Sequence, residues 1–469
     1  MKKNDHYPSQ SIKISSFLWV LLVILAAIFY WGEPRREKTG WTACGENPGD
    51  AFGTKVAPAG DVNGDGYADV AVWAEDYDGN RGKVYVYWGS AKGLSPTPAW
   101  SGQGESKGDE YGHSFGGVGD VNGDGFGDFI VAAQGYGTSS RPGLGKAYLY
   151  AGSSGGLVPT PAWTQVGHAK EELFGDCSGP AGDINGDGLP DVIIGAYGFD
   201  RFRGAAYLFH GSRTAYLSSQ PVWRGEGEAP GDWYGYSVFS IGDVRHDGST
   251  GVLIGAKQAA KGGLPHVGKT YAYYGGKGRL PSKPSWAVEG ENRQDLFGWR
   301  AISAGDVNGD AFSDVAVAAY SHSDSNCSYC GKVYLYGGSP QGLGRDPVWT
   351  GSGEKPGSLF GKSIASGDFN GDGYTDLVVG SPGWEGQRGK IYLFLGGPKG
   401  LARDPVWVME GENTGDNFGA YVANAGDVNR GGFPALLVGA PYASAEGKKS
   451  GKAYLFYGGK GGKLYPQPR

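Results

Sequence analysis

Cysteine, methionine and histidine are all scarce in this chain, with four, two and seven residues among 469. Four cysteines are too few to hold a chain of this length together, so a packed core has to do so. The histidines show no metal-ligand spacing and no H-E-x-x-H motif, which gives no support to a metal-dependent catalytic site. There is also no basic stripe of Lys and Arg, so nucleic acid is not an expected partner.

Long apolar runs are missing except at residues 17–31, which follow three N-terminal lysines. A run of this kind is typical of a secretory signal or a short membrane anchor. Its aromatic end at residues 28–31 suits a membrane interface better than a peptidase site, which favours an uncleaved anchor, although the two alanines before it leave cleavage open. We therefore expect a signal or anchor segment at 1–32, a linker at 33–40, and an exported remainder that is either membrane-anchored or secreted.

Two of the cysteines, Cys327 and Cys330, form a C-x-x-C in a polar loop. A zinc site would need a second pair nearby, and Cys44 and Cys177 lie far away in other repeats. A thioredoxin-like motif would need a helix N-terminus, whereas the flanking residues are typical of strands. The pair is therefore predicted to form a local disulfide in an oxidising compartment.

Glycine is abundant, at 89 residues, but without a G-x-y period, and aromatic residues are plentiful. This combination argues against collagen and disorder, and indicates many short strands joined by tight turns. An aspartate-rich loop recurs seven times, beginning at Asp61, Asp120, Asp183, Asp243, Asp306, Asp368 and Asp427. An aromatic-Gly pair precedes each loop; a β-branched run, an alternating G-K-x-Y-x-Y segment and a Trp near a proline follow it. A fixed period of this size indicates a stacked or circular architecture.

Each repeat contains four predicted strands, so the chain is expected to be all-β, a seven-bladed β-propeller over residues 41–469. The last repeat stops one residue before its Trp, whereas Trp41 has no repeat before it. The segment around Trp41 should therefore supply the outer strand of the last blade and close the ring, which removes the open edges of a linear stack.

Five of the loops place oxygen-bearing side chains at their first, third, fifth and ninth positions, and the carbonyl of the seventh residue adds a ligand. This donor pattern predicts up to five Ca²⁺ sites, because hard cations of this size take six or more oxygens. The predicted metal ligands are Asp61, Asn63, Asp65, Tyr67 and Asp69; Asp120, Asn122, Asp124, Phe126 and Asp128; Asp183, Asn185, Asp187, Leu189 and Asp191; Asp306, Asn308, Asp310, Phe312 and Asp314; and Asp368, Asn370, Asp372, Tyr374 and Asp376.

The alternatives to calcium are an EF-hand and plain turn chemistry. An EF-hand needs a Glu at the twelfth position, where these loops have valine or isoleucine in a strand. A turn would use Asp, Asn and Gly, but it has no evident need for the ninth-position carboxylate. The loops at Asp243 and Asp427 have lost ligands, with Arg245 standing at an amide position, and are expected to be empty. If the sixth position needs a positive φ, Ala311 is strained there where the other four loops have glycine.

An aromatic-Gly pair, a D-x-N-x-D-G-x-x-D loop and a small-residue turn such as residues 438–441 resemble the FG-GAP repeat. That repeat builds the seven-bladed propeller of integrin α subunits, in which cations in the hairpin loops stiffen the blades. The resemblance covers residues 41–469 and implies calcium in the five loops named above. It also implies adhesion or ligand binding, although a fold alone does not establish a function. Because no leg domains follow the repeats, we expect a free-standing integrin-like propeller rather than an integrin subunit.

Three functions are compatible with the sequence. The favoured one is a membrane-tethered surface protein that acts as a binding or adhesion module, with an extracellular or envelope protein or glycan as its ligand. The alternatives are an enzyme acting on a polysaccharide or phosphoester, and a scaffold of an envelope complex. No catalytic residues are predicted, because the recurring glutamates Glu105, Glu226, Glu291, Glu354 and Glu412 occupy equivalent loops and suggest a structural role. Ligand specificity is expected where the seven repeats disagree.

Overall fold

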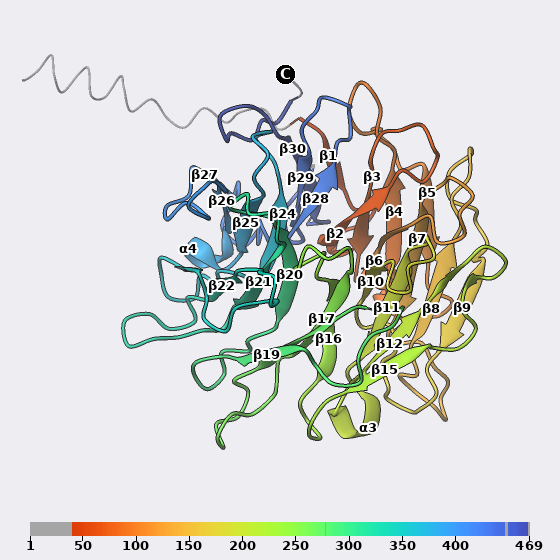
Figure 1. The fold of residues 1–469 in the computed structure, drawn as a ribbon. Coiled ribbons are helices and arrows are strands. Elements are labelled where there is room, and N and C mark those ends of the chain that lie inside the picture. Colours follow the sequence, from red (N-terminus) through yellow and green to blue (C-terminus); the bar gives the residue numbers. More distant parts are fainter. Residues whose placement is uncertain (1–39, 277, 446–448, 468–469) are drawn as a thin grey trace, which may run out of the picture. The chain divides into compact units, whose positions relative to one another are not determined.

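Each sequence repeat folds into a four-stranded antiparallel sheet, and the sheets follow one another in chain order (Figure 1). The computed structural model describes residues 40–276, 278–445 and 449–467. The predicted signal or anchor segment lies outside these described residues. Among them, no helix combines the length and the apolar character that a membrane span requires.

The described residues contain seven blades. The first is β2 (Phe52–Gly60), β3 (Asp69–Ala74), β4 (Lys83–Tyr87) and β5 (Trp100–Gln103). The second is β6 (Tyr111–Gly119), β7 (Asp128–Ala133), β8 (Lys146–Tyr150) and β9 (Trp163–Val166). The third is β10 (Ser178–Gly182), β11 (Asp191–Ala196), β12 (Ala205–Phe209) and β15 (Trp223–Glu226), with the small hairpin β13 (Gly211–Ser212) and β14 (Tyr216–Leu217). The fourth is β16 (Tyr234–Ser240), β17 (Gly251–Ala256), β18 (Lys269–Tyr274) and β19 (Trp286–Glu289). The fifth is β20 (Arg300–Gly305), β21 (Asp314–Ala319), β22 (Lys332–Tyr336) and β23 (Trp349–Ser352). The sixth is β24 (Ser363–Gly367), β25 (Asp376–Ser381), β26 (Lys390–Phe394) and β27 (Trp407–Glu410). The seventh is β28 (Tyr421–Gly426), β29 (Ala435–Ala440), β30 (Lys452–Tyr457) and β1 (Thr42–Cys44).

The second strand of every blade is buried along its whole length. It is rich in valine, leucine, isoleucine and alanine because both of its faces pack against neighbouring blades. Seven apolar clusters form the core, and each joins the strands of two consecutive blades, the last one joining blade seven to blade one. The core is thus a ring of interfaces between blades rather than a single central mass.

The N-terminal strand closes the ring as predicted. β1 pairs with β30 in antiparallel register, with Ala43 opposite Ala453, and the inner strands β28 and β2 of blades seven and one lie in contact. Trp41 packs edge-on against Tyr87 with ring centroids 5.0 Å apart, the same geometry that Trp100 makes with Tyr150 at 5.0 Å. Trp41 therefore does for blade seven what the repeat tryptophans do elsewhere.

Three short helical segments connect second and third strands: α2 (Tyr77–Asn80), α3 (Phe199–Phe202) and α4 (Trp384–Gln387). Each has two central residues in the left-handed region, for example Asp200 at φ 43° and Arg201 at φ 59° in α3. These segments are therefore tight turns rather than regular helices.

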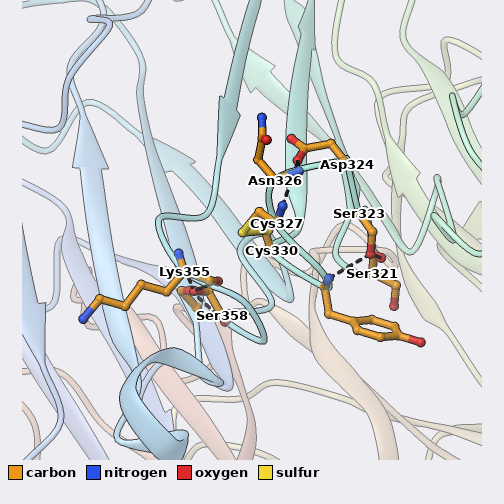
Figure 2. Close-up of a disulfide and its surroundings, with 10 residues drawn as sticks. Ser321, Ser323, Asp324, Asn326, Cys327, Cys330, Lys355 and Ser358 are labelled. Atoms are coloured by element: carbon orange, nitrogen blue, oxygen red, sulfur yellow. Dashed lines mark hydrogen bonds between the residues drawn. A yellow bond between two sulfur atoms is a disulfide. The ribbon is translucent and has the colours of Figure 1, made fainter.

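The predicted disulfide between Cys327 and Cys330 is confirmed, in the loop between β21 and β22 (Figure 2). The Asp324 carboxylate accepts the backbone N–H of Cys327 at 2.9 Å and so shapes the loop before the first cysteine. The carbonyl of Cys330 accepts the N–H of Phe360 at 2.8 Å. The bridged loop thus lies against the start of the sixth blade. Of the other cysteines, Cys44 is exposed and Cys177 is buried, and both are free.

A lysine-glutamate pair recurs between consecutive blades and explains the recurring glutamates. Glu105 accepts from Lys146 Nζ at 2.6 Å and from the Tyr148 hydroxyl at 2.9 Å. Glu291, Glu354 and Glu412 pair in the same way with Lys332, Lys390 and Lys452. The structural role expected for these four glutamates is confirmed.

The assignment of Glu226 to that set was wrong. Its carboxylate pairs with Arg224 of its own strand. The equivalent residue in the fourth repeat is Glu228, two positions later, which lies 2.9 Å from Lys269 Nζ. The error arose because two glutamates alternate with glycine here. Glu228 follows Trp223 by five residues, as the other four glutamates follow their repeat tryptophans, whereas Glu226 follows it by three.

Candidate functional site

The aspartate loops are hairpin turns between the first and second strands, and their side chains hold the turn together. In the second loop both carboxylate oxygens of Asp120 accept backbone N–H groups, including that of Gly125 at 2.7 Å. Asn122 Oδ1 accepts the N–H of Asp124 at 3.0 Å, and Asp124 Oδ1 accepts the N–H of Phe126 at 3.0 Å. The other four loops with the full ligand pattern repeat these contacts with small omissions. Aspartate and asparagine thus supply ordinary turn chemistry at the first, third and fifth positions.

The ninth-position aspartate has a structural use that the sequence did not suggest. Asp128 is fully buried, and it accepts the N–H of Val121 at 3.0 Å and that of Gly152 at 3.0 Å. It thereby ties the loop to the turn that follows the third strand of the same blade. Asp69, Asp191, Asp314 and Asp376 make the equivalent pair of bonds. A turn does have a use for this carboxylate, contrary to expectation.

Burial makes the charge of the ninth aspartate costly. Desolvation raises the pKa of Asp69 to about 7 and that of Asp128 to about 7, while the two backbone N–H groups act in the opposite direction. The other carboxylates of the same loop add repulsion in both cases. The loops therefore concentrate negative charge where a nearby cation is favourable.

The donor chemistry of these loops fits a calcium ion, since three carboxylates and an amide oxygen are hard ligands. Asp120 Oδ2, for example, accepts one N–H group and retains a lone pair. As the side chains lie, however, no group of three or more His, Cys, Asp or Glu residues within the described residues converges on a metal position. The predicted ligands of each loop are therefore neighbours that already serve as hydrogen-bond acceptors.

The two degenerate loops carry arginines. In the loop at Asp243, Arg245 Nη2 lies 2.9 Å from Asp247 Oδ2 and 2.8 Å from the carbonyl of Gly275. In the loop at Asp427, Arg430 reaches across to the first loop and donates to the carbonyls of Gly66 at 2.8 Å and Asp65 at 3.0 Å. A guanidinium thus lies at the first loop as well as at the fourth.

Backbone bonds link loop one to loop two, loop four to loop five, loop five to loop six, and loop seven to loop one. The carbonyl of Asp61 accepts the N–H of Gly127 at 2.9 Å, and that of Asp427 accepts the N–H of Ala68 at 3.2 Å, which joins loop seven to loop one. A hollow of about 320 Å³ lies between the first two loops, with Asp61, Asp120 and Phe126 in its lining. This end of the propeller is where the seven repeats agree.

The opposite end of the inner strands is where they disagree. Two positions per blade face it: the residue after the aromatic-Gly pair and the residue after the second strand. We call these fourteen residues the variable ring. In blade order it consists of Thr54, His113, Asp176, Tyr236, Trp299, Lys362 and Ala420, and of Glu75, Gln134, Tyr197, Lys257, Tyr320, Pro382 and Pro441. Six strand residues separate the two ends by about 20 Å.

Charged groups from different blades converge at the variable ring. Burial lowers the pKa of Lys55, which follows Thr54, to about 8; Arg300 of blade five lowers it further, and Asp176 of blade three opposes the shift. His113 Nε2 lies 3.1 Å from Asp176 Oδ1, and its Nδ1 lies 2.8 Å from Gln134. No sequence motif marks this site, so none of its residues is among the predicted site residues. Aligning the residue after each aromatic-Gly pair would have revealed seven different chemical characters.

Seven four-stranded blades closed by an N-terminal strand, with aspartate hairpins at one end, define a seven-bladed β-propeller. The FG-GAP repeat family matches residues 178–209, 298–336 and 360–394, and the FG-GAP-like repeat matches residues 61–131. The chain therefore contains FG-GAP repeats, and its propeller is similar in sequence to part of the integrin α subunits.

Known proteins similar to the chain include integrin alpha-IIb of Mus musculus, 32% identical over 255 residues that cover 52% of this chain and 23% of the integrin. Phosphatidylinositol-glycan-specific phospholipase D of Bos taurus is 34% identical over 175 residues, which cover 35% of this chain and 21% of that protein. Among solved structures, the Dos1 propeller aligns with a TM-score of 0.47 at 11% identity, covering 90% of this chain and 96% of that one. The matches thus span about a fifth of the length of these two curated relatives.

Proposed function

We propose that this chain is an exported binding or adhesion module that holds its ligand at the variable ring. The observation that carries the proposal is the contrast between the two ends of the inner strands. The aspartate loops repeat with nearly the same residues and contacts, as expected of structural parts. The variable ring brings different side chains together at one place, including His113, Trp299 and Lys362, as expected of a recognition site.

Integrin relatives support an extracellular or envelope location and a protein or glycan partner. The integrin matches are about 30% identical and recur across several subunits. The apolar run at 17–31 supports export and membrane tethering. Together these features favour a surface-displayed propeller whose variable ring faces away from its aspartate loops.

Binding is tested with matched variants at the two ends of the propeller. Trp299→Ala and His113→Ala alter the variable ring, whereas Lys92→Met alters an exposed residue near the aspartate-loop end. Labelled wild-type protein should bind a subset of an immobilised panel of matrix proteins and glycans, and the ring variants should lose at least tenfold in affinity while Lys92→Met does not. Equal binding by all four proteins would place the ligand elsewhere.

We also propose that the five aspartate loops with the full ligand pattern bind Ca²⁺. In each loop the first, third, fifth and ninth residues and the carbonyl of the seventh would hold the ion, beginning with Asp61 in the first loop. The ion would supply positive charge that offsets carboxylate repulsion. The residues themselves shape the hairpin, so binding is expected to stiffen the blade rather than to perform chemistry.

Calorimetry with Ca²⁺ tests this, with an expected stoichiometry of five. Asp124→Asn should remove one site, whereas Asp247→Asn in the degenerate fourth loop should leave the stoichiometry unchanged. Ca²⁺ at a hundredfold excess over the Kd of a site adds about 2.7 kcal/mol to the free energy of unfolding. Removal of Ca²⁺ with a chelator should therefore lower the melting temperature. No binding heat together with a chelator-independent melting temperature contradicts the proposal.

One observation keeps an enzyme as the second candidate. A relative of similar identity is a phospholipase D by name, and His113 is held by Asp176 at 3.1 Å beside the buried amine of Lys55. A screen with phosphodiester and polysaccharide substrates distinguishes an enzyme from a binding module. Turnover by the wild-type protein that is lost in His113→Ala would favour an enzyme. A scaffold would instead be recognised by one stoichiometric partner recovered from membranes.

A further inference from the structure

An aromatic row crosses the variable ring from blade three to blade five. It begins at Phe202, which is 36% exposed, and continues through Trp233, Tyr197, Tyr236, Trp299 and Tyr320. Neighbouring ring centroids lie between 4.4 and 6.1 Å apart. Trp233 is not a repeated feature, since the residue at its position in the other blades is Ala51, Glu110, Leu173, Leu296, Leu359 or Asn417.

Two lysine amines lie at the inner end of this row. Lys257 Nζ is 3.2 Å from the ring centroid of Tyr236, 4.3 Å from that of Trp299 and 4.7 Å from that of Trp233. Lys362 Nζ is 3.8 Å from the centroid of Trp299. The two cations thus share the Trp299 ring, and the Trp299 indole N–H is fixed by the carbonyl of Lys362 at 3.0 Å.

Neither amine has a carboxylate within ion-pair distance anywhere in 40–276, 278–445 or 449–467. Asp176, the acid that acts on the Lys257 amine, is engaged by His113 at 3.1 Å. Arg300 adds a third cation, with its guanidinium 4.7 Å from the ring of Tyr421. Basic side chains therefore outnumber free carboxylates on the side of the variable ring formed by blades four to six.

Burial makes this excess unfavourable in the free protein. Lys257 is only 6% exposed, and burial lowers its pKa to about 6. Burial and repulsion from Arg300 and Lys55 lower the pKa of Lys362 to about 7. An anion placed between the two amines would relieve both effects, so the arrangement is poised for a negatively charged ligand.

We propose that the variable ring of blades four to six binds an anionic saccharide, with the acidic group held by Lys257 and Lys362 and the sugar lying along the aromatic row towards Phe202. This inference rests on the binding function proposed above. A saccharide is favoured over an acidic peptide because the row offers ring edges and faces at several successive positions.

The probes are a tetrasaccharide containing glucuronate, its sulfated counterpart, a neutral glucose tetrasaccharide and a tetraglutamate peptide, titrated by calorimetry into the full chain. We expect one or both anionic saccharides to bind, and the neutral sugar and the peptide to bind at least tenfold more weakly. The carboxylated and sulfated arms show which acid the two amines prefer.

The key variant is Lys257→Met combined with Lys362→Met, which should lose at least tenfold in affinity for the anionic saccharide. Methionine matches the lysine stem and removes a buried charge, so the variant should fold and melt no lower than the wild type. Lys257→Arg with Lys362→Arg should retain binding better than the methionine pair, and Lys92→Met should bind like the wild type.

The saccharide proposal is overturned if neither anionic saccharide binds at millimolar concentration, if the methionine pair binds them unchanged, or if tetraglutamate binds more tightly than both. A failure of the saccharide proposal can be distinguished from a failure of the proposed binding function. If the anionic saccharides do not bind but Trp299→Ala still abolishes capture of a partner from the panel, the binding module stands and only its ligand class is wrong.

Discussion

Single residues in this propeller depart from the repeat at two kinds of place, and the consequences differ. At the aspartate loops a departure affects the conformation of a turn. Ala311 has φ 73°, whereas its counterparts Gly66, Gly125, Gly188 and Gly373 have φ between 82° and 96°. The strain anticipated at Ala311 from the sequence is therefore confirmed. At the variable ring a departure introduces charge or an aromatic ring, which bears on ligand binding instead.

Ala311→Gly should stabilise the protein. Relief of the left-handed strain is worth about 1 kcal/mol, and the backbone N–H of residue 311 can keep its bond to Asp306, now 2.7 Å. Urea unfolding should show this gain as a higher midpoint at an unchanged slope. Ala91→Gly is the matched control, because Ala91 is exposed and has no positive φ. This control should be neutral or destabilising. An equal gain in stability from Ala91→Gly would mean that relief of strain at residue 311 does not explain the effect.

Lys257 should give the stability of the protein a distinctive pH dependence. Its pKa is lowered to about 6 in the folded protein from an ordinary 10.5, so between these values the unfolded chain binds the proton and the folded chain does not. The free energy of unfolding therefore rises with pH across this window, by at most about 1.4 kcal/mol per pH unit for one group. Asp176, Lys362, Arg300 and Lys55 act on the same amine.

Lys257→Met isolates the contribution of this lysine. Urea unfolding between pH 7 and 9.5 should show a shallower rise for the variant, with higher stability than wild type at the lower end. Lys92→Met should keep the wild-type slope, since Lys92 is exposed. A slope unchanged by Lys257→Met would mean that the amine is charged in the folded protein at neutral pH.

At the scale of strands and loops, the periodic features were the predictable ones. The strand order, the disulfide loop and closure by the segment around Trp41 all follow from patterns that recur or are visibly incomplete. The use of Asp128 was not predictable in the same way, because its partner Gly152 lies 24 residues along the chain and a backbone N–H leaves no mark on the sequence. Glu226, by contrast, could have been told from Glu228 in the sequence, since only Glu228 has the five-residue spacing from its repeat tryptophan that the other glutamates show.

The closing strand provides the prediction at this scale. Trp41 donates its indole N–H to the carbonyl of Ser95 at 2.8 Å and packs on Tyr87, so it joins blade seven to blade one. Trp41→Ala should cost about 2–3 kcal/mol, since the side chain is half-buried. Val348→Ala changes a side chain that is 67% exposed and should leave the melting temperature almost unchanged. A similar loss of stability in Trp41→Ala and Val348→Ala would show that Trp41 contributes little to closure.

At the scale of the whole molecule, any blade of the propeller could be the one that is completed by both ends of the chain. Every blade interface has its own apolar cluster, and closure needs only that one blade be completed by two separate stretches of chain. In this protein that blade is the seventh. The variable ring is the part that breaks this symmetry, because its cations and aromatics gather on blades three to six.

A circular permutant tests whether closure is transferable. Gly40 lies directly against the backbone of Pro466, so a short linker can join residue 467 to residue 40. New termini between Arg345 and Asp346, both exposed, would make β23 the first strand and β22 the last, and these two would then complete the fifth blade as β1 and β30 complete the seventh. The permutant should melt in one transition within a few degrees of the unpermuted chain, because every blade interface is kept.

A chain lacking residues 41–44 is the comparison and should melt clearly lower. Stepwise melting of the permutant, or a loss as large as that of the deletion, would mean that stability depends on which blade is closed, and hence that blades five and seven are not equivalent despite their common fold.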